Sequence, residues 1–155
     1  MANEVYDSKN DTLDHIEKVA YRLAEIIGNL DIRSTVHDRS KLEDPEKSAF
    51  DTATPKLKGL KYGSDEYRTS LREIKPALQH HYSVNSHHPE FYGDQGIKGM
   101  SLMDMMEMLC DWKAAVERHD PPNSIIASID HNKGRFNISA DLEQILKNTV
   151  KELGW

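Results

Sequence analysis

Apolar residues recur at alternating steps of three and four in several long segments of this sequence, which is the period of one helical face. The spacing predicts amphipathic helices over about residues 11–30, 64–82, 101–119 and 140–153. The segment 124–139 fits a short helix and turn better than the alternative, a hairpin. The pattern therefore predicts an all-α fold, a single compact helical bundle that spans residues 1–155 as one domain.

Turn-forming residues predict where these helices are interrupted. The helix over 11–30 is expected to fray at Gly28 and Asn29, and Asp31 could then cap a short helix through Ile32, Val36 and the pair His37–Asp38. Prolines and glycines over 41–63 predict broken helix and loop, and Pro76 is expected to kink the helix over 64–82. The segment 83–99 is rich in turn formers and is predicted to be a loop, which at such a length is often functional.

Charge and composition exclude several classes of function. The net charge is −6, with 26 acidic and 20 basic residues, which argues against sequence-independent nucleic-acid binding. The sequence has no apolar run long enough for a membrane span and no signal-peptide core, so a cytoplasmic protein without a membrane partner is expected. The single cysteine, Cys110, cannot form an internal disulfide and is predicted to be a buried thiol in a reducing compartment. Phosphate-loop, dinucleotide-binding, Cys-x-x-Cys and Gly-x-Ser-x-Gly motifs are absent.

The adjacent pair His37 and Asp38 is the first candidate for chemistry, because imidazole and carboxylate together suit a divalent transition metal. His15 lies at the border of the apolar stripe of the first predicted helix, and Asp111 lies on the helix over 101–119. Together these four residues would supply two nitrogen and two oxygen ligands. The ordinary interpretation of His15, a solvated or hydrogen-bonded side chain at a helix boundary, is the competing one.

Asp111 is open to two interpretations. It shares a helical face with Asp104 and Glu107, and an acidic stripe is usually the solvated side of an amphipathic helix. The apolar side of the same helix is expected to consist of Leu102, Met105, Met106, Leu109, Trp112 and Val116. Met108, however, lies on the acidic side, so the helix is apolar around most of its circumference and a carboxylate there can face the interior.

Four of the eight histidines fall within nine residues: His80, His81, His87 and His88. A surface tract without a role is one interpretation. The other is that some of these side chains complete a metal site or bind an anionic substrate beside it. Lys41, three residues after Asp38, would reach the same region and offer a point charge to a phosphate.

The order of His15, His37, Asp38 and Asp111 resembles the HD-domain superfamily, a group of all-helical, metal-dependent phosphohydrolases. The stretch from His37 to Lys41 is also similar to the His-Asp-x-x-Lys of the dinuclear HD-GYP branch, whose lysine contacts phosphate. That branch has a His-His pair followed by glutamate, and both 80–81 and 87–90 could match it. The Gly-Tyr-Pro signature itself is missing, so hydrolysis of cyclic di-GMP is not implied.

Over nearly its full length the chain resembles an uncharacterised family from phages and bacteria. The stretches that carry this likeness are HDRSKLEDPE, YGSDEY, HHYSVNSHHPE and MSLMDMMEMLCDWKAA. This likeness implies no particular substrate. If the protein is encoded by a phage, the expected location is the cytoplasm of the host.

The superfamily resemblance implies a metal-dependent phosphohydrolase that uses metal-activated water. A small nucleotide is the expected substrate, with a nucleoside 5'-monophosphate as first choice because the chain is small. The expected cofactor is one or two ions of Mn, Fe, Co, Ni or Zn. The residues expected to hold the first ion are His15, His37, Asp38 and Asp111. Asp38 would bridge to any second ion, with His81 and His88 as its further ligands. Lys41 would bind the phosphate, joined by His80, His81 and His88 if there is no second ion.

The expected catalytic residues are Asp38, Lys41 and Glu46. Glu90 is the alternative to Glu46 for orienting water or protonating the leaving group.

Two other classes of function stay open. The same pocket could bind a nucleotide or signalling molecule without turning it over, or the metal could serve only to stabilise the fold. The exposed faces of the helix from Met100 to His119 could also bury a homodimer contact, although a core role is favoured for them.

Overall fold

The structure is a computed structural model that describes residues 6–60, 64–118 and 124–155. Within these ranges the chain forms helices and no strand, so the predicted all-α class is confirmed. Its internal contacts fall into two units, one ending at Val36 and the other beginning at His37. The single domain expected over residues 1–155 stays a prediction. None of the described helices is both long and apolar enough to cross a membrane.

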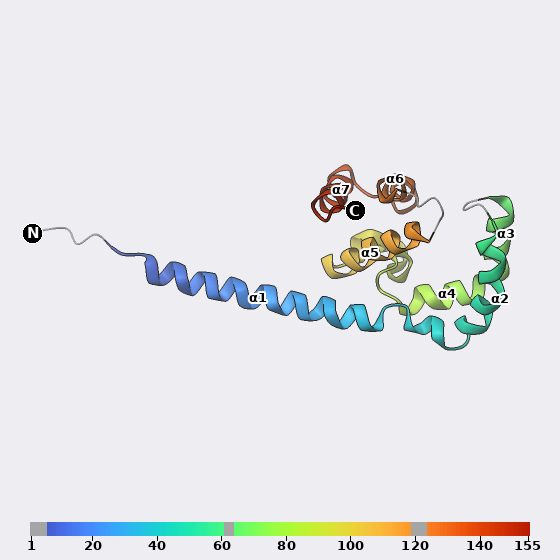
Figure 1. Cartoon of the computed structure of the whole chain (residues 1–155), viewed down its shortest axis with the longest axis horizontal. Helices are drawn as coiled ribbons and strands as arrows, with labels where there is room; N and C mark the ends of the chain where they lie inside the picture. The colour runs from blue at the N-terminus through green and yellow to red at the C-terminus, as the bar shows by residue number, and fades with distance from the viewer. Residues whose placement is uncertain (1–5, 61–63, 119–123) are drawn as a thin grey trace, which may run out of the picture. The chain divides into compact units, whose positions relative to one another are not determined.

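The first unit is built on one uninterrupted helix, α1 (Lys9–Val36, Figure 1). It continues through Gly28 to Val36, so the fraying predicted at 28–29 and the separate helix predicted from Asp31 are wrong. A single glycine costs a helix only about 1 kcal/mol relative to alanine, which is small for a helix of 28 residues. None of the residues of α1 is buried.

The second unit begins with the short 3₁₀ helix η1 (Arg39–Leu42), followed by α2 (Glu46–Lys58), α3 (Asp65–Glu73) and α4 (Lys75–Val84). The broken helix and loop predicted over 41–63 is therefore largely the regular helix α2. Pro55 lies inside α2, where its missing N–H removes only one backbone hydrogen bond near the end of the helix. Pro76 does more than kink its segment: α3 ends before Ile74, and the proline occupies the first turn of α4, where its N–H is not needed.

The rest of the second unit comprises the 3₁₀ segment η2 (Pro89–Gly99), α5 (Leu102–Glu117), α6 (Ile125–Phe136) and α7 (Ala140–Glu152). The short helix expected after residue 124 is confirmed as α6. Figure 1 shows α5, α6 and α7 gathered together. Their shared core also includes residues from η2 and the α6–α7 connection, and it consists of Ile97, Met100, Met108, Leu109, Trp112, Val116, Ile125, Ile129, Ile138, Leu146 and Val150. This core packs α5 against residues of η2, the segment that follows the loop carrying His87 and His88.

The orientation of α5 differs in part from the predicted one. Leu102 and Met106 are 72% and 43% exposed, whereas Met108 and Asp104 are 1% and 3% exposed. The acidic side of the helix therefore faces the interior, because the Asp104 carboxylate is satisfied there by hydrogen bonds and its burial costs little. Cys110 is exposed, so the buried thiol predicted for it is wrong.

Candidate metal centre

Asp38 lies in the tight turn that follows α1, where it precedes η1. Its backbone is left-handed, with φ 55° and ψ 15°. Aspartate tolerates this conformation better than most residues, and strained backbone of this kind is common at functional sites. His37 and Asp38 are therefore carried by a turn and not by the short helix predicted from Asp31.

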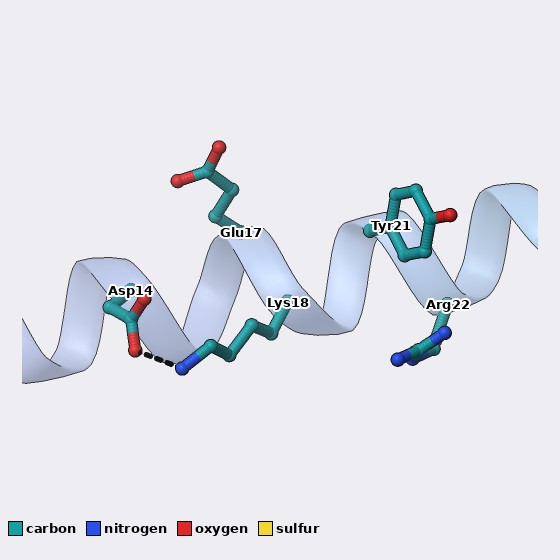
Figure 2. Close-up of a pocket in the computed structure, with 5 residues that line it drawn as sticks. All are labelled: Asp14, Glu17, Lys18, Tyr21 and Arg22. Carbon is teal, nitrogen blue, oxygen red and sulfur yellow. Dashed lines mark hydrogen bonds and ion pairs between the residues drawn. The ribbon is translucent and has the colours of Figure 1, made fainter.

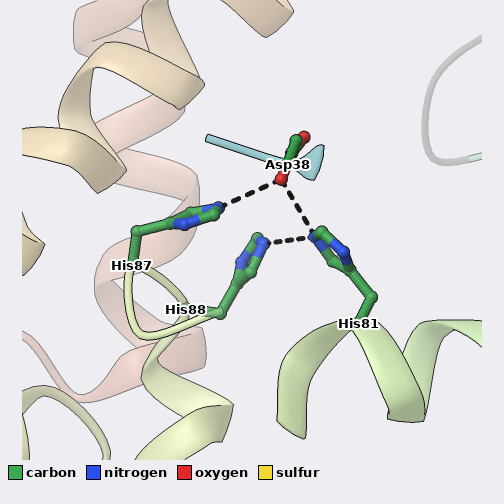
Figure 3. A group of neighbouring side chains, drawn as sticks. All are labelled: Asp38, His81, His87 and His88. Atoms are coloured by element: carbon green, nitrogen blue, oxygen red, sulfur yellow. Dashed lines mark hydrogen bonds and ion pairs between the residues drawn. The ribbon is translucent and has the colours of Figure 1, made fainter. Parts of the chain in front are cut away.

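Three histidines point their rings at this carboxylate (Figure 3). His81 comes from α4, while His87 and His88 come from the connection between α4 and η2. The Asp38 Oδ1 atom lies 3.3 Å from His81 Nε2 and 3.4 Å from His87 Nε2. The Nε2 atoms of His81 and His88 are 2.8 Å apart. Four possible ligand atoms therefore converge on one small volume.

The two separations from Asp38 Oδ1 suit a shared metal ion. Ligand atoms about 2.1 Å from a transition metal stand roughly 3.0–3.4 Å apart in octahedral or tetrahedral geometry. Two of the converging atoms, Asp38 Oδ1 and His87 Nε2, are buried and make no hydrogen bond. Because buried polar atoms are normally satisfied, unpaired lone pairs at this point fit a cation between them.

Carboxylates behind the rings fix which nitrogen faces the centre. Glu46 Oε2 lies 2.9 Å from His81 Nδ1, and Glu107 Oε1 lies 3.1 Å from His87 Nδ1. A carboxylate only accepts, so each Nδ1 donates its hydrogen outward and each Nε2 presents a lone pair inward. Such outer carboxylates are the usual partners of metal-binding histidines.

Glu46 is fully buried, with 0% exposure, and its other contacts are His80 Nδ1 at 2.8 Å and the Ser40 hydroxyl at 3.0 Å. Both oxygens of Glu46 are engaged by histidines, an arrangement that suits a positioning role, and the direct catalytic role predicted for Glu46 stays a prediction. His80 lies outside the convergent group, with its side chain 42% exposed.

Replacing Glu46 by glutamine tests this role. The amide keeps the volume but replaces one accepting oxygen with a donor, so we expect metal affinity to fall roughly 10- to 100-fold. Titration against a competing chelator measures the change, with Glu43→Gln as a matched control, since Glu43 is exposed and precedes α2. Unchanged affinity in Glu46→Gln would contradict the role.

A second group lies on the other oxygen of the same carboxylate. His37 Nε2 is 3.6 Å from Asp38 Oδ2 and 3.8 Å from Asp111 Oδ1, and the three residues form a possible ligand set. His37 Nδ1 lies 2.8 Å from Glu107 Oε1. Lys41 Nζ is 2.5 Å from Asp38 Oδ2. Asp38 is thus shared between two ligand groups, with a lysine beside one of them.

The histidines of the two groups differ in charge. Hydrogen bonding to Asp111, and then to Glu107, raises the pKa of His37 to about 9 despite partial burial. Burial, and then the neighbouring His87 and His81, lowers the pKa of His88 to about 3. Burial also lowers the pKa of His81. At pH 7 the metal-free protein therefore carries charge on His37, while His81 and His88 are neutral and able to bind a metal.

The charge on His37 predicts a pH-dependent stability. Its folded pKa of about 9 lies above the ordinary 6.5, so its stabilisation is complete below pH 6.5 and disappears as pH rises through 9. In chelator-treated protein, we expect His37 to contribute up to about 3 kcal/mol at pH 6 and almost nothing at pH 10. Urea unfolding of wild type and His37→Gln measures this as a difference that shrinks with pH. A constant difference would contradict it.

The α5 carboxylates explain how the loop is held. Asp104 accepts hydrogen bonds from Ser86 Oγ at 2.7 Å, from Tyr92 OH at 2.8 Å and from the Ser101 hydroxyl at 2.6 Å. Although burial opposes the effect, the hydrogen bonds from Ser101 and then Ser86 hold the pKa of Asp104 well below its usual range. Ser86 immediately precedes His87, so Asp104 ties the histidine loop to the same helical face that carries Glu107.

A protein-family model matches residues 4–152 of the chain, and its description is a family of unknown function, DUF5662. The chain belongs to DUF5662. Comparison with curated proteins found no match, and comparison with solved structures found none either. The matched range of this DUF5662 member includes every ligand candidate named above.

In this DUF5662 member, most of the residues predicted from the sequence come together. One group contains the predicted ligands Asp38, His81 and His88. The second group contains Asp38 again, together with His37 and Asp111. His15 lies on α1, in the first unit, and is exposed; the ligand groups found among the described residues do not include it, and its role stays a prediction.

Two participants were not predicted. His87 belongs to the histidine cluster but is not among its predicted ligands, and Glu107 is predicted only to lie in an acidic stripe. The stripe itself was the available signal, because Asp104, Glu107 and Asp111 recur at steps of three and four. A shallow hollow on α1, lined by Asp14, Glu17, Lys18, Tyr21 and Arg22, is formed by one helix surface and is no competing candidate (Figure 2).

Proposed function

We propose that the protein is a metal-dependent phosphohydrolase that acts on a small nucleotide, with a nucleoside 5'-monophosphate as first choice. The observation that carries this proposal is the Asp38 carboxylate, whose two oxygens face two different groups of metal-ligand atoms. A shared carboxylate of this kind suits a pair of ions that act together on one phosphoryl group.

The residues divide between the two groups. Asp38, His81, His87 and His88 would hold one divalent transition metal, and His37, Asp38 and Asp111 would hold another. When bound, such an ion lowers the pKa of a coordinated water and polarises a phosphoryl oxygen. Mixed nitrogen and oxygen ligands suit Mn, Fe, Co, Ni and Zn.

Lys41 would supply the charge that recognises the phosphate. In the structure its ammonium contacts Asp38 Oδ2 at 2.5 Å and lies 5.5 Å from the centre of the Phe50 ring. This places a positive charge at the edge of the second ligand group, where it can stabilise negative charge that develops on phosphoryl oxygens. The acidic net charge of the chain does not oppose an anionic substrate, because the local field would be dominated by the ions and Lys41.

Glu90, the alternative to Glu46 for a direct role, is paired elsewhere. Its Oε1 accepts from Arg135 Nη2 at 2.6 Å. Neither glutamate is therefore assigned as the group that protonates the leaving oxygen, and the proposal rests on Asp38, Lys41 and the histidines.

A phosphate-release screen tests the proposal. Nucleoside mono-, di- and triphosphates and cyclic dinucleotides are incubated with wild type in the presence of Mn, Fe, Co, Ni or Zn, with Asp38→Asn as the inactive control. Elemental analysis of protein purified without chelators is run in parallel. Metal-dependent release from a nucleotide, lost in Asp38→Asn, is expected. Wild type that holds no metal would overturn the proposal.

One observation favours a second candidate, a metal site that only stabilises the fold. The group of Asp38, His81, His87 and His88 offers four protein ligands, the number found in closed structural zinc sites. Cobalt substitution distinguishes the two functions. Exchangeable water on the cobalt supports the enzyme, whereas a closed tetrahedral spectrum together with no phosphate release supports the structural site.

A further inference from the structure

The helix α1 carries one continuous apolar face. Its members are Leu13, Ile16, Val19, Ala20, Leu23, Ile26, Ile27 and Leu30. Leu23 is 54% exposed and Ile27 is 66% exposed. Isolated helices are marginal in water, and most helical stability in proteins comes from packing of an apolar face. A 28-residue helix with this face therefore needs a partner surface.

We propose that this partner is the same face of a second copy of the chain, paired in the antiparallel direction. Six of the apolar residues follow strict alternating steps of three and four: Leu13, Ile16, Ala20, Leu23, Ile27 and Leu30. This is the spacing of the a and d positions in a coiled coil, and it continues over 18 residues, about 27 Å of helix.

The order of these residues supports a two-fold arrangement. With the symmetry axis between positions 21 and 22, Leu13 lies opposite Leu30 of the second copy, and Ile16 lies opposite Ile27. Near the axis, the small Ala20 lies opposite the large Leu23. Each layer thus pairs an a position with a d position, and the contact is self-complementary, as a closed dimer requires.

The residues beside the seam favour antiparallel over parallel pairing. Val19 and Ile26 widen the apolar face on one side only. In the antiparallel arrangement this side meets its own counterpart, so Val19 lies beside Ile26 of the second copy. In a parallel pair, the side of the seam that carries Val19 and Ile26 would contact the other side of the second helix. Ile26 would then lie beside Asp31 of the second copy, which places a carboxylate against an apolar side chain.

The other side of α1 carries charged side chains that are exposed to solvent. Lys18 Nζ pairs with Asp14 Oδ2 at 2.6 Å, and Arg22 pairs with Glu25 at 2.7 Å. Figure 2 shows part of this polar surface, with the ion pair between Lys18 and Asp14. The charges therefore lie away from the proposed seam, so pairing buries none of these ion pairs.

Sedimentation equilibrium of the full chain tests the pairing. We expect wild type to be a dimer and Leu23→Lys to raise the dissociation constant by about 100-fold or more, since one buried leucine is lost from each copy. Ile32→Lys is the matched control, because Ile32 is 63% exposed and lies outside the apolar face. A monomeric wild type, or equal weakening by Ile32→Lys, would overturn the proposal.

Disulfide cross-linking tests the direction without relying on a disruptive variant. In a Cys110→Ser background, chains with Ala20→Cys are mixed with tagged chains with Leu23→Cys and oxidised mildly. Antiparallel pairing predicts a mixed cross-link between the two variants. Efficient cross-linking of Leu23→Cys to itself would instead indicate parallel pairing and overturn the register. Neither experiment depends on metal or on catalysis.

Discussion

Replacing Asp38 by asparagine is expected to remove metal binding from both ligand groups at once. The substitution removes the negative charge whose two oxygens face His81 and His87 on one side and His37 on the other. Losing even an outer hydrogen-bond partner of a metal ligand costs roughly 10- to 100-fold in affinity, so we expect loss of this shared ligand to cost more than about 100-fold. Elemental analysis and chelator competition measure it.

Asparagine is the informative replacement because it also tolerates the left-handed backbone found at position 38. Loss of metal in Asp38→Asn then reports on the carboxylate and not on the turn. Asp51→Asn serves as the control, since it makes the same charge change in the same unit at a side chain that is 64% exposed. Stoichiometric metal of unchanged affinity in Asp38→Asn would contradict the role of the Asp38 carboxylate as a ligand shared by the two groups.

Replacing His87 by alanine is the second large expected effect. His87 is 2% exposed, its Nε2 atom has no hydrogen-bond partner, and its Nδ1 atom faces Glu107. We expect metal affinity to fall by at least about 100-fold, because a ligand is lost directly. His80→Ala is expected to change affinity less than about tenfold, since His80 contacts the centre only through Glu46.

Comparison of these two variants separates the convergent histidines from the merely adjacent ones. Chelator competition is performed on both, and urea unfolding of the metal-free proteins accounts for the cavity left at the buried position. Equal losses in His80→Ala and His87→Ala would mean that the cluster acts as a general cationic patch. That outcome would contradict a defined ligand set.

Much of the helical architecture was predictable from local pattern. The spacing of apolar residues predicts α1, α5 and α7. In the structure, Ser64 and Ser101 cap α3 and α5. The errors arose where a local breaker costs less free energy than the rest of its helix contributes. Gly28 does not end α1, and Pro55 does not break α2, because each costs less than the surrounding helix supplies.

The sequence predicts which types of residue form the candidate centre, but not which of the neighbouring histidines are its ligands. Adjacent His37 and Asp38 together with a histidine cluster indicate metal chemistry at the level of sequence. Choosing among neighbouring histidines requires knowing which Nε2 atoms converge, and that depends on the turn after α4 and on the Asp104 network. Likewise, no local pattern shows that Glu46 folds beneath His81, 35 residues later in the chain.

The Glu107 carboxylate has a consequence for how the two ligand groups fill. A single oxygen, Oε1, lies within 3.1 Å of both His87 Nδ1 and His37 Nδ1. An ion at one group would draw electron density from its histidine and alter the hydrogen bond that remains for the other. Since Asp38 is shared as well, the two groups cannot load independently. By thermodynamic linkage, an ion in the first group changes the metal affinity of the second group by the same factor as an ion in the second group changes that of the first.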